Sequence, residues 1–61
     1  MKFLYVFNES DRDFLIKKGY TEIKSDKTKN IYIFDNKSNM HFQLHEDNPE
    51  IEFVATDMMT L

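Results

Sequence analysis

The run Phe-Leu-Tyr-Val-Phe at residues 3 to 7 constrains the fold of this chain more than any other stretch. Successive side chains of a strand point to opposite faces, so the three aromatic residues line one face and Leu4 and Val6 line the other. A strand that is apolar on both faces needs cover on both, which predicts a place inside a sheet and not at its edge. We expect this strand to span Lys2–Phe7.

A short helix is predicted directly after this strand. Asn8 and Ser10 are residue types whose side chains accept a hydrogen bond from a free N–H in the first turn of a helix. Gly19 is a natural left-handed stop at a helix end. The sequence therefore predicts a helix over Ser10–Lys18 that lies on the sheet. The side chains expected to hold it there are Phe14, Leu15 and Ile16.

Four further strands are expected, at residues 20–24, 31–34, 40–45 and 51–55. The first carries charges, which suits an edge, and Met40–His45 alternates apolar and polar residues cleanly. The polar turns at 26–30 and 35–39 favour antiparallel hairpins, and the strand after the helix should run parallel to the first. The sequence predicts one α+β domain over residues 1–61, with one short helix on a small mixed sheet of four to five strands.

The small size of the chain predicts self-association. Chains of about this length commonly need disulfides, a metal or oligomerisation in addition to their core. The sequence has 61 residues and no cysteine, which excludes disulfides, and one short helix leaves the second face of the sheet open. We expect a homodimer formed by that face or by the C-terminal segment. The predicted interface residues there are Met58, Met59 and Leu61.

Nothing in the sequence predicts catalysis, a cofactor or a metal site. On a strand, His41 and His45 would share a face but lie about 13 Å apart, at about 3.3 Å per residue. No cysteine or tight carboxylate cluster completes a ligand set. The serines occupy cap and turn contexts, and a single glycine cannot form a phosphate-binding loop. We expect a protein that is not an enzyme and binds no cofactor.

The charge of the chain is unevenly distributed. The net charge is −3; residues 1–45 have a balance of +2, and residues 46–61 hold five acidic residues and no basic one. An acidic balance argues against binding to a phosphate backbone, whereas an acidic segment fits a basic partner surface or only keeps the domain soluble. The predicted partner-binding residues are Glu46, Asp47, Glu50 and Glu52, with the polar face of the expected strand 40–45, namely His41, Gln43 and His45.

Nucleic-acid binding is the alternative function. It would use basic side chains on the hairpin turns beside aromatic rings that stack on bases. The residues concerned are Lys24, Lys27, Lys29 and Lys37, with Tyr20 and Tyr32. Asp26, Asp35 and the acidic C-terminal part oppose this function.

Three segments carry a resemblance to known proteins: Met1–Asp11, Leu15–Tyr20 and Asn30–Asn36. They resemble short proteins encoded by phages and prophages of low-GC Gram-positive bacteria, and most of all the small anti-Hachiman family. That family inhibits a bacterial helicase–nuclease defence system. The resemblance implies a non-enzymatic, self-associating inhibitor that binds a host defence protein.

No apolar run is long enough to cross a membrane, so we expect the chain to act in the host bacterial cytoplasm.

Overall fold

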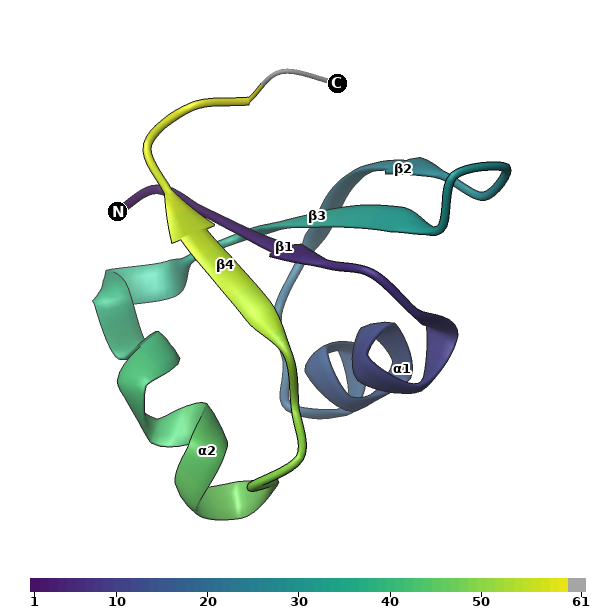
Figure 1. The fold of residues 1–61 in the computed structure, drawn as a ribbon. Coiled ribbons are helices and arrows are strands. Elements are labelled where there is room, and N and C mark those ends of the chain that lie inside the picture. Colours follow the sequence, from purple (N-terminus) through teal and green to yellow (C-terminus); the bar gives the residue numbers. More distant parts are fainter. Residues whose placement is uncertain (60–61) are drawn as a thin grey trace.

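A computed structural model of the chain describes residues 1–59, apart from the side chains of residues 38–40. Its elements form a compact α+β arrangement, which confirms the predicted fold class (Figure 1). They are β1 (Phe3–Val6), α1 (Glu9–Lys17), β2 (Glu22–Asp26), β3 (Ile31–Asp35), the 3-10 helix η1 (Lys37–Gln43), α2 (Leu44–Asp47) and β4 (Phe53–Thr56).

The four strands form one sheet in the order β2-β3-β1-β4. The predicted central place of β1 is confirmed, since it pairs with β3 on one side and β4 on the other. β1 and β2 run in the same direction, as expected for two strands joined by a helix, but β3 lies between them and pairs antiparallel with both. The expectation of a mixed sheet is therefore wrong, and the topology is a split β-α-β arrangement.

Local signals at both ends of α1 behave as predicted. The Asn8 side chain accepts a hydrogen bond from the backbone N–H of Asp11 at 2.8 Å, and Gly19 has a φ of 94°. Leu15 is fully buried. Ile16 is 44% exposed and does not hold the helix on the sheet as expected, because it lies about 100° around the helix from Leu15.

The segment predicted as a strand at residues 40–45 is helical. Its backbone belongs to η1 and α2, so the turn at 35–39 joins a strand to a helix and forms no hairpin. The helical path brings Leu44 into the core, where it is 2% exposed. The last strand, β4, consequently pairs with β1 and not with a neighbour in sequence.

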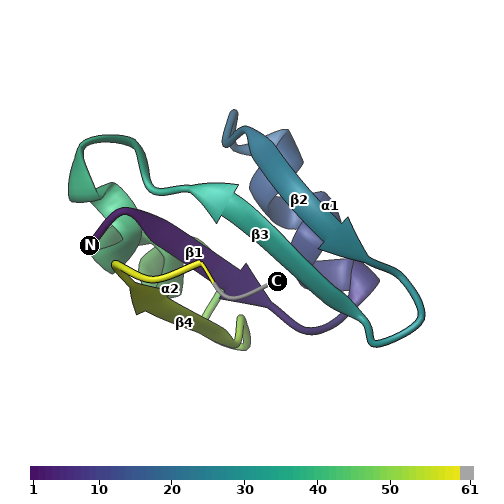
Figure 2. The same cartoon turned by 90° about the horizontal axis from the view of Figure 1, so that it is seen from above.

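The molecule has two layers and one open face. Figure 2 shows α1 and α2 behind the sheet, with the C-terminal segment crossing in front of it. The core lies between the helices and the sheet and consists of Leu4, Val6, Leu15, Tyr32, Phe34, Leu44 and Ile51. Because side chains alternate along a strand, the neighbours of Leu4 and Val6 on β1 and of Phe34 on β3 point to the other face. On that face Ile33 of β3 is fully buried, so the open part lies over β1 and β4.

Candidate functional site

The four predicted acidic residues lie on a fixed backbone, with Glu46 and Asp47 in α2 and Glu50 and Glu52 in the connection from α2 to β4. The backbone N–H of Asn48 donates to the Leu44 carbonyl at 2.8 Å, and that of Ile51 donates to the Asn48 carbonyl at 3.1 Å. The N–H of Glu52 donates to the buried Asp11 carboxylate at 3.2 Å. The connection is thereby tied both to α2 and to the start of α1.

Three of the four predicted acidic residues present free carboxylates at this end. The side chains of Glu46, Glu50 and Glu52 are exposed, and no ion pair involves them within residues 1–59. Asp47 differs, because its carboxylate lies 2.7 Å from the ammonium of Lys18. We define the acidic surface as Glu46, Glu50 and Glu52.

The two histidines are packing residues. His45 stacks on the Phe53 ring with centroids 5.0 Å apart, and His41 meets the same ring edge-on at 5.9 Å. His45 Nε2 donates to the Ile51 carbonyl at 3.0 Å, and His41 Nδ1 lies 2.8 Å from the Asn36 amide nitrogen. The expectation that His41, Gln43 and His45 form the polar face of a strand is therefore wrong. Across the described residues, no three metal-ligating side chains gather.

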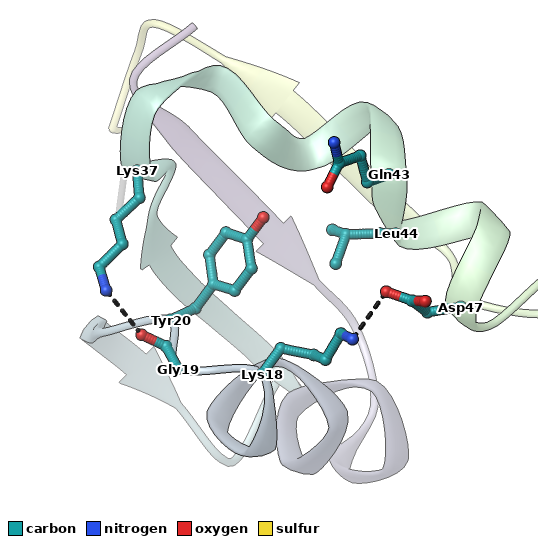
Figure 3. A pocket seen from close by; sticks show the side chains of 7 residues that line it. All are labelled: Lys18, Gly19, Tyr20, Lys37, Gln43, Leu44 and Asp47. Atoms are coloured by element: carbon teal, nitrogen blue, oxygen red, sulfur yellow. Dashed lines mark hydrogen bonds and ion pairs between the residues drawn. The ribbon is translucent and has the colours of Figure 1, made fainter.

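A pocket of about 300 Å³ lies between the end of α1 and the segment from η1 to α2 (Figure 3). Its lining residues are Lys18, Gly19, Tyr20, Lys37, Gln43, Leu44 and Asp47. Lys37 donates to the Gly19 carbonyl at 3.1 Å and Lys18 pairs with Asp47, so both lysines bridge the pocket walls. Burial raises the pKa of Tyr20, and the nearby charge of Lys18 opposes this shift. The sequence does not reveal this pocket, because its walls meet only through tertiary packing.

Three of the residues named for nucleic-acid binding are engaged within the fold: Tyr20, Tyr32 and Lys37. Tyr32 is 1% exposed and belongs to the core. Tyr20 is partly buried against the same core and lines the pocket, and Lys37 is engaged with Gly19. Neither tyrosine offers a free ring face beside the basic turn of residues 27–30.

The open sheet face carries a shallow apolar groove of about 270 Å³, lined by Tyr5, Phe7, Val54, Thr56 and Met58. Phe7 is 44%, Val54 51% and Met58 66% exposed. The C-terminal segment reaches this face, because the Tyr5 hydroxyl donates to the Met58 carbonyl at 3.0 Å. Of the predicted interface residues, Met58 and Met59 are exposed here, and Leu61 lies outside the described residues.

Two surfaces are therefore candidates for binding a partner. They are the acidic surface, which precedes β4 in the chain, and the apolar groove on the open face. None of the helices in residues 1–59 is long and apolar enough to cross a membrane. Comparison of this chain with protein-family models, with curated proteins and with solved structures finds no match.

Proposed function

We propose that this chain is a non-enzymatic, phage-encoded inhibitor that binds a bacterial defence protein of the helicase–nuclease type in the host cytoplasm. The observation that carries the proposal is the acidic surface, whose three carboxylates have no basic partner in the described residues. The backbone beneath them is held by hydrogen bonds, so little entropy is lost when a partner binds. The resemblance to the anti-Hachiman family supports the same function.

Charge complementarity explains how such a surface would inhibit. Helicases and nucleases hold nucleic acid with Lys and Arg side chains that contact phosphates. Carboxylates on a rigid frame attract the same side chains, speed association and select the partner. The inhibitor would then compete with nucleic acid for one basic channel.

The test is charge reversal on the acidic surface. The variant Glu46→Lys/Glu50→Lys should keep its circular dichroism spectrum, since both side chains are exposed. We expect its affinity for the purified helicase–nuclease complex, measured by calorimetry, to fall at least about tenfold at low salt, because close charge pairs across interfaces contribute 1.5 kcal/mol or more. The loss should shrink as salt is added.

The matched control is a variant with the same change in net charge, made on α1 instead of the acidic surface. Glu9 and Asp13 are exposed in the first turns of this helix, so Glu9→Lys/Asp13→Lys also raises the net charge by four, since each change replaces one negative charge by one positive charge. The control should bind the complex within about threefold of the wild type. Equal loss in both variants, or none in either, would contradict the acidic surface as the binding site.

A second candidate function rests on the aromatic residues of the open face. Phe3 and Tyr5 on β1 and Phe7 directly after it alternate with the core residues Leu4 and Val6. A four-stranded sheet with aromatic residues on one face is one way that proteins bind single-stranded RNA. The comparison with RNA-binding sheets rests on the fold alone. Filter binding of single-stranded RNA and DNA at two salt concentrations separates the functions, because electrostatic binding must weaken steeply with salt. If the first proposal is right, the protein retains neither the RNA nor the DNA on the filter.

We further propose that the open face forms a homodimer, which leaves the acidic surface free for the partner. The supporting observation is the group of exposed apolar side chains that lines the groove, since large apolar patches commonly mark interfaces. Met58 of the C-terminal segment also lines this groove, and Met59 beside it is exposed.

A further inference from the structure

β4 is an edge strand without the features that usually protect such an edge. Only β1 pairs with it within the described part of the chain, and Figure 2 shows β4 as the outermost strand on its side of the sheet. Its sequence is Phe-Val-Ala-Thr, with no charge and no proline. An edge of this kind presents free backbone N–H and C=O groups to another strand.

The opposite edge of the sheet is protected. β2 reads Glu-Ile-Lys-Ser-Asp, so three of its five residues are charged. Its register with β3 also shifts between Glu22 and Lys24. Charges and bulges are the devices by which natural proteins prevent edge pairing. The two edges therefore differ, and only β4 is suited to accept a strand.

We propose that the outer edge of β4 pairs with an extended strand of the partner protein that carries Lys or Arg opposite Glu52. This rests on the proposed function and names the form of the partner. Main-chain hydrogen bonds supply affinity in such strand addition, and pockets for alternate side chains supply specificity. Here specificity would come from the charge of Glu52, since the groove beside Val54 and Met58 belongs to the proposed dimer face.

Charge argues against a second copy as the occupant. Residues 46–57 hold five acidic residues and no basic one. Pairing two β4 edges antiparallel with Val54 opposite Ala55 of the second copy would place Glu52 opposite Asp57. Like charges at opposed positions destabilise strand pairing. Asp57 already lies 3.6 Å from the N-terminal ammonium, so the carboxylate that selects a basic residue is Glu52.

The first experiment uses two synthetic hexapeptides as probes, acetyl-Lys-Thr-Val-Thr-Val-Lys-amide and the same peptide with Glu at both ends. Each is titrated into the isotope-labelled full chain and followed by NMR. We expect the lysine peptide to shift the amides of residues 52–57 and to slow their hydrogen exchange. The glutamate peptide should bind roughly tenfold more weakly, because the charge pair opposite Glu52 changes from attractive to repulsive. Shifts at β2, equal binding of the two peptides, or no binding of either would overturn the proposal.

A pair of variants places the contact on one edge. Val54 on β4 and Ile23 on β2 are exposed to a similar degree, 51% and 43%. Val54→Lys gives β4 the kind of charge that protects β2, so it should abolish binding of the lysine peptide. Ile23→Lys should leave that binding unchanged. Loss in both variants, or in neither, would contradict an edge contact at β4.

The same variants separate this inference from the proposed function. Binding to the helicase–nuclease complex is measured for Val54→Lys and for Glu46→Lys/Glu50→Lys. If the charge-reversal variant alone loses affinity, the acidic surface binds the partner and the β4 edge does not. If both retain full affinity, the proposed function at this end of the molecule fails as well.

Discussion

At the scale of single residues, Asp11 is the buried charge that connects two distant parts of the chain. Its carboxylate accepts hydrogen bonds from the Asn8 amide at 3.0 Å and from the Glu52 N–H at 3.2 Å. The residue is 7% exposed. It fixes the start of α1 to the segment before β4, and thus holds the backbone of the acidic surface in place.

Replacing Asp11 should therefore destabilise the whole fold. Asp11→Ala removes one acceptor from two donors, and hydrogen bonds to charged groups contribute about 1.5–3 kcal/mol. We expect the free energy of unfolding, measured with urea, to fall by about 2–3 kcal/mol. Asp13→Ala is the control: Asp13 is exposed and pairs only with Arg12 in the described residues, so it should cost under about 1 kcal/mol. Equal effects would show that the tie to Glu52 contributes nothing.

Tyr20 gives the fold an alkaline pH dependence. Because burial raises the pKa of Tyr20 above its ordinary value of about 10, the neutral hydroxyl favours the folded state. This contribution is fully present below pH 10 and is lost as pH rises through the folded pKa. The wild type should thus lose more stability than Tyr20→Phe between about pH 9 and pH 11 in urea unfolding. Parallel stability curves for the two proteins would contradict this prediction.

At the scale of elements, the segment 37–47 shows why short apolar patterns are ambiguous. Residues 40, 42 and 44 alternate as in a strand, yet 40 and 44 are also one helical turn apart, as are His41 and His45. A segment of six residues is too short to distinguish the two-residue period of a strand from the helical period of about 3.6 residues. The helical path places both histidines against the Phe53 ring, and this contact between distant residues is not visible in the sequence.

Other elements were predictable because their signals are local. β1 and β3 are apolar on both faces, and α1 has a cap at Asn8 and a glycine after its end. Each of these elements can therefore be predicted from the residues within it or next to it. The acidic surface was also predictable, since Glu46, Glu50 and Glu52 are close in sequence. The pairing of β4 with β1, the pocket beside Tyr20 and the ion pair of Lys18 with Asp47 join residues that are far apart in the sequence, so no local sequence pattern predicts them.

The stacking of His45 on Phe53 allows a direct test of the helical path of η1 and α2. On a strand, His41 and His45 would lie about 13 Å apart and could not both contact one ring. In the structure, the ring current of Phe53 should shift the His45 ring protons upfield in the NMR spectrum. Phe53→Leu should remove this shift while keeping the strand apolar, and Val54→Leu, on the opposite face of β4, should not. An unshifted His45 ring in the wild type would contradict the helical path.

At the scale of the whole molecule, the main feature is a sheet with helices on one face and an open apolar groove on the other face, beside β1 and β4. Both helices pack against one face, and the other face carries Phe7, Val54 and Met58 with large exposed fractions. A standard interface buries about 800 Å² on each partner, which is about a fifth of the 4153 Å² surface of this chain. A dimer of this size would use most of the open face, including the Val54 side chain, whereas the outer backbone edge of β4 and the acidic surface would lie at its rim.

The proposed dimer predicts a doubled mass that depends on the open face. Light scattering at micromolar concentration should give about twice the chain mass of 7.4 kDa. In a symmetric interface each side chain counts twice, so Phe7→Ser, at about 1 kcal/mol for each copy, should raise the dimer Kd about thirtyfold. Ile16→Ser is the matched control, because Ile16 is equally exposed, at 44%, but lies on α1, on the other side of the sheet. A monomer mass for the wild type, or equal weakening by the two substitutions, would show that the open face does not hold two copies together.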